Sequence, residues 1–255
     1  MTAGSAVRSA DDPQGRPRGV GAELISHTGH ALRACLNAIL GYAQILELDR
    51  AHPLTPVQKE RVDQIQASGW QLLRLIDDAL ELARIGAGQL AVSMEPVALA
   101  PLLRNSLAQL DEPAVSSRVG LDAASHDAIV WADPGRLRQV VVKLLLGALK
   151  CDRHGGSVLV GLSRSAEGGT MIRIRGDGLA LAPGQLEKMF LPLDHPAAKD
   201  GPAEGVQLGL VLAQKLVELM GGRLQVHRDP TSGSELRILL RGHAPGGGPS
   251  SAADA

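Results

Sequence analysis

His30 is the residue of this 255-residue chain whose surroundings best suit a nucleophile. Between residues 23 and 48 the apolar side chains follow a three-four spacing, which predicts one stripe of an α-helix. His30, Arg33 and Asn37 point away from that stripe, so we expect His30 to face solvent. An imidazole with a pKa near ~6.5 offers a neutral ring nitrogen that can attack phosphorus. Taken alone, such a histidine is more often only a solvated polar residue.

A second helix is predicted from Pro56 to about Ile85. It begins with a hydroxyl cap at Thr55, a proline in the first turn and a glutamine, Gln58, that closes a capping box. Its apolar residues keep a heptad register, and the stripe of the first helix, which includes Cys35, is expected to be buried. A helical hairpin buries both stripes well only against a second copy, so we expect a homodimeric four-helix bundle.

The pattern changes to mixed α and β after a boundary near residues 86–97. We expect, in order, a helix over 97–110, a strand within 127–132, a long helix that starts at Asp133-Pro134, a β-hairpin of 156–165 and 170–176, helices over 183–190 and 208–220, and strands over 223–228 and 235–240. The predicted fold class is α+β, a helical hairpin followed by an α/β sandwich with helices on one face of a mixed sheet. Residues 1–20 and 243–255 are rich in small residues and are expected to be disordered.

Composition restricts the partners and the compartment. The formal net charge is −1, from 26 basic and 27 acidic residues, so we expect no nucleic-acid partner. The chain has two cysteines and no apolar core near its start, which indicates a cytoplasmic, thiol-reduced protein. The longest apolar stretch is interrupted by Lys143 and is far shorter than the ~20 residues that span a bilayer, so no membrane segment is expected.

From Glu23 to Leu240 the order of segments resembles a bacterial sensor histidine kinase without its sensor. The stretch GHALRACLNAILG, residues 29–41, is similar to the family's phosphoacceptor motif SHELRTPLNAILG and places His30 at the phosphorylated histidine. The stretches WADPGRLRQVV and LGLVLAQKLVELMGGRLQV look like parts of the family's ATPase lobe. The resemblance implies a dimerisation and phosphoacceptor domain over 21–90 and an ATPase-like lobe over 91–242.

Beside the histidine, the sequence departs from the family pattern at two positions. The acidic residue that normally follows the phosphorylated histidine is Ala31, which cannot accept a proton, so direct attack on ATP would lose general-base help of ~10²-fold or more. The Thr or Asn that positions water for dephosphorylation is Ala34. We therefore expect no phosphatase activity of the family's usual kind.

The ATPase lobe departs from the pattern at its asparagine box, which reads like NLLxNAxK in the family. Here the stretch is KLLLGALK, with Lys143 and Gly147 in place of the two asparagines. Neither residue supplies a side-chain oxygen for Mg²⁺. Lys150 is retained and could meet a phosphate, although a solvated lysine at a helix end is at least as good an interpretation.

The two glycine boxes are also altered. The aspartate that holds adenine in the family is replaced by Gly176, while Gly178 is retained. In the second box, GVQLGL, Gln207 replaces the middle glycine and Gly209 remains. A glutamine restricts the close approach of backbone N–H groups to phosphates. No metal site is predicted, and ATP and Mg²⁺ are expected as cofactors only if the chain is an active kinase.

These residues favour a histidine phosphotransferase derived from a kinase, in which His30 passes phosphoryl groups between aspartates of response-regulator receiver domains. In that reading Arg33 holds phosphate charge and Asn37 lies under the docking surface. Two alternatives stay open: an ATP-dependent sensor kinase that autophosphorylates His30, and a non-catalytic dimeric scaffold that binds a response regulator or a kinase. Loss of function on replacing His30 would exclude the scaffold.

Overall fold

The computed structural model describes residues 20–110, 119–122, 128–151, 157–165, 169–176, 190, 204–229 and 233–242. The two ends that were expected to be disordered lie outside these residues, apart from Val20 at the start of the first helix. The helix expected over 183–190 lies outside them except for its last residue, and so does Gly178.

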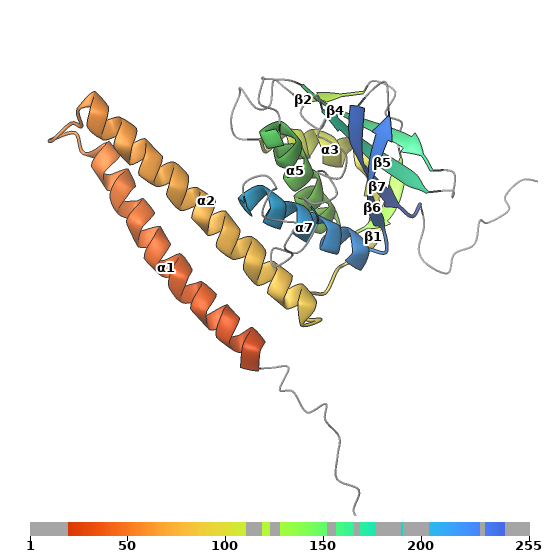
Figure 1. The fold of residues 1–255 in the computed structure, drawn as a ribbon, viewed down its shortest axis with the longest axis horizontal. Coiled ribbons are helices and arrows are strands. Elements are labelled where there is room, and N and C mark those ends of the chain that lie inside the picture. Colours follow the sequence, from red (N-terminus) through yellow and green to blue (C-terminus); the bar gives the residue numbers. More distant parts are fainter. Residues whose placement is uncertain are drawn as a thin grey trace, which may run out of the picture.

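Two long antiparallel helices form the N-terminal region, α1 (Val20–Leu48) and α2 (Pro56–Gly86) (Figure 1). The predicted start of α2 is confirmed. The hydroxyl of Thr55 accepts a hydrogen bond from the Gln58 amide at 3.4 Å, and the Gln58 side chain accepts one from the Thr55 amide at 2.9 Å. This reciprocal capping fixes where the chain turns back after α1.

Small residues let the two helices approach closely at two levels. A Cβ atom added to Gly69 of α2 would lie 2.6 Å from Cδ2 of Leu40 on α1, closer than real Cβ contacts. Near the other end of the hairpin, Gly29 of α1 lies against Leu80 of α2 in the same way. Leucine side chains thus fill the space that a larger residue would need.

The predicted apolar stripe of α1 is only partly buried within one chain. Leu36 and Leu40 are buried, whereas Leu32 and Ile39 remain 49% and 52% exposed. Cys35 is exposed, so the expectation that it is buried is wrong for the single chain. It follows that the hairpin leaves part of its apolar surface uncovered.

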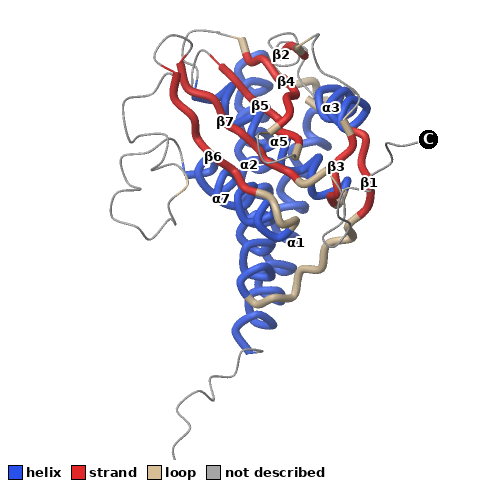
Figure 2. Tube along the Cα trace, turned by 90° about the vertical axis from the view of Figure 1, so that its right-hand side faces the viewer, coloured by secondary structure: helices blue, strands red, loops and turns tan. Residues whose placement is uncertain are grey.

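The second region is a five-stranded mixed sheet with helices on one face, and a separate pair of strands (Figure 2). The order in the large sheet is β2-β4-β5-β7-β6, in which β2 runs parallel to β4 and the other neighbours are antiparallel. The elements of this lobe are β1 (Glu95–Ala98), α3 (Leu99–Ala108), β2 (Val119–Leu121), β3 (Ile129–Ala132), α5 (Pro134–Cys151), β4 (Val158–Arg164), β5 (Thr170–Gly176), α7 (Glu204–Leu219), β6 (Arg223–Asp229) and β7 (Gly233–Leu240).

One core lies between the sheet and the helices. Leu144 of α5, Ile174 of β5 and Leu212 of α7 are fully buried in it. The α+β architecture predicted from the sequence is therefore confirmed. None of the helices in the described part of the chain combines the length and the apolar character needed to cross a bilayer.

The structure adds two short strands that the sequence did not predict and moves one helix start. β1 exists because it pairs antiparallel with β3, and β2 because it pairs with β4. α7 begins at Glu204 rather than near Leu208, so the described part of the second glycine box is helical.

Candidate functional site

His30 lies on α1 with its side chain exposed, as the sequence predicts. The small residues Ala31 and Ala34 are exposed beside it. Because Gly29 contacts Leu80, the level of His30 along the hairpin corresponds to the last third of α2. The imidazole is therefore open to a protein that approaches α1 from solvent.

The two other predicted site residues of α1 differ in their surroundings. Nε of Arg33 donates a hydrogen bond to Oδ1 of Asp77 on α2 at 2.6 Å, which makes an ion pair across the hairpin. Asn37 is exposed two turns beyond His30. Arg33 follows His30 by three residues and so lies on the adjacent turn, within reach of a group attached to the imidazole. The proposed roles of both residues stay predictions.

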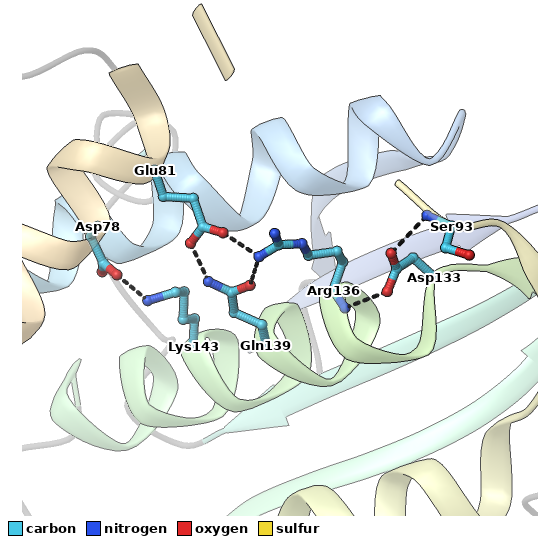
Figure 3. Close-up of polar contacts among 7 residues, drawn as sticks. All are labelled: Asp78, Glu81, Ser93, Asp133, Arg136, Gln139 and Lys143. Atoms are coloured by element: carbon cyan, nitrogen blue, oxygen red, sulfur yellow. Dashed lines mark hydrogen bonds and ion pairs between the residues drawn. The ribbon is translucent and has the colours of Figure 1, made fainter. Parts of the chain in front are cut away.

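A row of polar contacts joins the hairpin to the lobe at the same level. Three residues of α5, Arg136, Gln139 and Lys143, point toward Asp78 and Glu81 of α2 (Figure 3). Nζ of Lys143 lies 2.6 Å from Oδ1 of Asp78, and Arg136 and Gln139 both donate hydrogen bonds to the Glu81 carboxylate. We call these five residues the seam.

Asp78 is the most buried charged residue of the seam, with a side chain that is 12% exposed. Desolvation raises the pKa of the Asp78 carboxyl above its ordinary value of 3.8, and the hydrogen bond and charge of Lys143 oppose this only in part. The neighbouring carboxylates of Glu81 and Asp77 raise it further. Lys143 therefore compensates a buried charge that is costly to hold there.

The start of α5 positions the three seam residues of that helix. Oδ1 of Asp133 accepts a hydrogen bond from the Arg136 amide at 3.0 Å, and Oδ2 accepts one from the Ser93 amide at 2.9 Å. Burial alone would raise the pKa of Asp133, but the hydrogen bonds from the backbone amides of Arg136, Ser93 and Gly135 outweigh it and lower that pKa. Asp133 thus caps α5 and ties the linker after α2 to it.

In the lobe, the positions that the resemblance assigns to nucleotide chemistry have other neighbours. Lys143 is held by Asp78, and a Cβ at Gly147 would lie 3.1 Å from Cδ2 of Leu210 on α7. Gln207 is only 2% exposed, and a Cβ at Gly209 would lie 3.6 Å from Oδ2 of Asp78.

These contacts bear on whether the residues present fit Mg²⁺ and ATP. α7 covers the site of the second asparagine, and Gly209 lies beside the seam. Lys150 is in the last turn of α5. Lys143 and Gly147, which replace the two asparagines of the box, have no side-chain oxygen that could bind a cation.

Sequence reasoning missed the seam as a unit. On α5 the residues 136, 139 and 143 are polar at a three-four spacing within a helix whose other charged residues are Arg138 and Lys150. On α2 the acidic residues 78 and 81 are three apart. These complementary stripes were a readable signal of helix-to-helix contact. What the spacing could not give is that the two stripes face each other.

Comparison with known proteins identifies both regions. The model of the family described as "His Kinase A (phospho-acceptor) domain" matches residues 22–88. The model of the family described as "Histidine kinase-, DNA gyrase B-, and HSP90-like ATPase" matches residues 132–243. The two matches fall on the helical hairpin and on the α/β lobe.

Two curated relatives cover most of this chain but are much longer. The circadian input-output histidine kinase CikA of Synechococcus elongatus is 30% identical over 225 residues, which is 86% of this chain and 29% of that protein. The cell-division control histidine kinase PdhS of Brucella suis is 26% identical over 230 residues, 86% of this chain and 22% of that protein. The chain therefore spans less than a third of the length of these relatives.

Solved structures of histidine kinases share the fold of this chain. Full-length ShkA, crystallised in complex with AMPPNP, superposes with a TM-score of 0.68 at 28% identity, over 88% of this chain and 47% of that one. The Acinetobacter baumannii histidine kinase AdeS shares the fold with a TM-score of 0.57 at 17% identity, over 84% of this chain and 98% of that one.

Proposed function

This chain belongs to the two-component sensor histidine kinase family, and from that premise we propose that it is a histidine phosphotransferase that relays phosphoryl groups between receiver-domain aspartates through His30. The observation that carries the proposal is the engagement of Lys143, at the position of a family asparagine, in an ion pair with Asp78. That contact uses the position for holding the lobe rather than for holding a metal.

The proposed transfer requires no ATP. A neutral ring nitrogen of His30 attacks the phosphorus of an aspartyl phosphate on a receiver domain, an N–P bond forms, and the P–O bond to the aspartate breaks. The aspartate leaves as a carboxylate and the second ring nitrogen loses its proton to water. Transfer to another receiver runs the same step in reverse.

The surroundings of His30 support attack on a protein-bound phosphoryl group. The exposed Ala31 and Ala34 leave room for a docking receiver domain, which would bring its own Mg²⁺ and acidic site. Arg33, oriented by Asp77, would neutralise phosphoryl charge one turn from the imidazole. Asn37 would lie under the docked surface.

We also propose that the working form is a homodimer in the cytoplasm. Leu32 and Ile39 of α1, and Ile65 and Leu72 of α2, are each about half exposed in the single chain. A second hairpin would cover them in a four-helix bundle. Replacing Ile39 by aspartate is expected to shift the chain to monomer in sedimentation velocity, whereas Arg104→Asp on the exposed surface of α3 should leave the dimer intact.

Phosphotransfer is tested with candidate receiver domains charged with ³²P from acetyl phosphate. The expected result is acid-labile label on the chain, lost in His30→Gln and kept in His52→Gln, because His52 is an exposed loop residue. Label that survives His30→Gln contradicts the proposal. Absence of label from every receiver, with His30 intact, favours the scaffold.

A second function, ATP-dependent autophosphorylation of His30, is favoured by the names of the relatives and by the AMPPNP complex of ShkA. Calorimetric titration with ATP, with and without Mg²⁺, separates the two. We expect no binding at millimolar nucleotide. Micromolar binding would replace the proposed role with that of a kinase, and incubation with γ-labelled ATP would then label His30.

A further inference from the structure

The seam is placed where the lobe could influence the phosphoacceptor. Asp78 follows Asp77, which pairs with Arg33 on the turn after His30. Leu80, two residues further along α2, contacts Gly29 directly before His30. The ion pair of Lys143 with Asp78 is therefore on the level of His30, on the neighbouring helix.

Apolar contacts also hold the lobe to the hairpin. Leu82 and Ile85 of α2 pack against the core of the lobe. Such contacts are not directional, and they would tolerate a small rotation or slide of the lobe along α2. A mostly buried ion pair is more demanding, because a movement that separates the two charges leaves each of them buried without its partner.

Stability alone does not explain the pair. Lys143 and Asp78 have side chains that are 18% and 12% exposed, so both charges have given up most of their hydration. The raised pKa of Asp78 means that burial, together with the neighbouring carboxylates of Glu81 and Asp77, costs its ionised form more than Lys143 returns. Gly209 of α7 lies beside the same carboxylate, since a Cβ added there would be 3.6 Å from Oδ2 of Asp78.

We propose that Lys143 is a positioning residue whose ion pair with Asp78 fixes the orientation of the lobe against α2 at the level of His30. The lobe then serves as a rigid brace for the phosphoacceptor hairpin. The inference rests on the proposed function for its consequence at His30, but the orientation can be measured without any phosphoryl transfer. If phosphotransfer through His30 is not found, the orientation of the lobe can still be tested in the same way.

The test measures a distance between the two regions in the full chain. Cys35 and Cys151 are replaced by serine, and spin labels are attached at Glu60→Cys on α2 and Gln225→Cys on β6, both exposed positions. Glu60 is on the opposite face of α2 from Ile65 and Leu72. Labelled chains are diluted with an excess of unlabelled chains, so that nearly every dimer that contains a labelled copy contains only one. Pulsed dipolar spectroscopy then gives the distance distribution between hairpin and lobe.

Wild-type and Lys143→Arg chains are expected to give one narrow distribution, because arginine retains the charge. Lys143→Met and Lys143→Asp should broaden or shift it, and Asp78→Lys combined with Lys143→Asp should restore it. Lys215→Met is the matched control, since Lys215 pairs with Glu218 within α7 on the surface. Circular dichroism confirms that each variant is folded.

Two results overturn the proposal. A wild-type distribution in Lys143→Met would mean that the apolar contacts, together with the contacts of Arg136 and Gln139 to Glu81, orient the lobe without the Lys143 pair. A folded charge-swapped double variant that stays as broad as the single variants would mean that the charge pair is not what fixes the orientation.

Discussion

The lobe and the hairpin differ in how far each completes its own core. In the lobe, Leu144, Val160 and Ile174 are fully buried within one chain. In the hairpin, Leu36 and Leu40 are buried while Ile39 on the same helix is 52% exposed. The lobe is therefore closed by intrachain contacts, and the hairpin leaves apolar surface for another molecule.

The two regions also differ in which residues keep the family pattern. The hairpin keeps the histidine and most of its motif, apart from Ala31 and Ala34, although its core is incomplete. The lobe keeps a complete core although Lys143, Gly147 and Gln207 stand where the resemblance places residues of the nucleotide boxes. The core and the chemistry of a fold are thus carried by different side chains. The loss of one does not require the loss of the other.

The largest effect on stability is expected from Leu144→Ala in the lobe. Leu144 is fully buried, so the change should leave a cavity and lower the free energy of unfolding by about 2–5 kcal/mol. Urea unfolding at two chain concentrations measures it, and the loss should be the same at both. A loss that depends on concentration would mean that the lobe core is completed by a partner, and the contrast with the hairpin would fail.

Gly69→Ala should have the next largest effect, on the hairpin. The new Cβ would lie 2.6 Å from Leu40 Cδ2, so the helices must separate or Leu40 must leave its rotamer, at about 1–3 kcal/mol. The gain in helix propensity, about 1 kcal/mol, offsets part of this cost.

Gly41→Ala is the matched control, because nothing lies within 4 Å of the Cβ position at that mid-helix glycine. It should stabilise the hairpin by roughly 0.5–1 kcal/mol. Thermal unfolding of both variants decides the matter, and equal effects at the two glycines would contradict the close packing at Gly69.

The sequence was sufficient for the elements that carry a strong local signal. The caps at Thr55 and Asp133 and the alternation of the β4–β5 hairpin are local, and the structure confirms the elements that they predicted. β1 and β2 were missed because strands of four and three residues exist only through their partners. Cys35 was misassigned because helical periodicity identifies an apolar stripe but not what covers it.

The candidate site divides in the same way. The exposure of His30 follows from one helix and could be predicted. Arg33 and Asp77 are 44 residues apart in the sequence, and Lys143 and Asp78 are 65 apart, so no local pattern contains either pair. Sequence could identify Lys143 as a departure from the family and could not say what the lysine contacts instead.

Asp133→Ala should have a moderate effect, confined to the lobe. It removes the cap of α5, and losses of this kind cost about 0.5–2 kcal/mol. Because the pKa of Asp133 is lowered in the folded chain, its contribution is fully present above the ordinary value of 3.8 and is lost as pH falls through the lower folded pKa. The free energies of unfolding of wild type and Asp133→Ala, measured between pH 2 and 7, should therefore become equal only in acid. A difference between them that stays constant over this range would contradict the role of the carboxylate.

The titration of Asp78, where the two regions meet, should have the smallest effect on the free energy of unfolding. It should also change that free energy with pH in the opposite direction to the titration of Asp133. The pKa of Asp78 is raised in the folded chain, first by burial, so between 3.8 and the folded pKa the folded state binds more protons than the unfolded state. The carboxyl faces Lys143 of α5 and, on its own helix, Asp77 and Glu81. Stability should rise as pH falls through that window, by at most about 1.4 kcal/mol per pH unit for one group.

Asp78→Asn removes this titration, so the difference in stability between wild type and Asp78→Asn isolates it from the carboxylates that titrate in the other direction. The difference should move in favour of wild type as the pH is lowered from neutrality, and should level off below 3.8. A difference that moves against wild type on acidification would mean that Lys143 stabilises the Asp78 carboxylate by more than its burial costs. The contact between hairpin and lobe would then contribute to stability as well as to orientation.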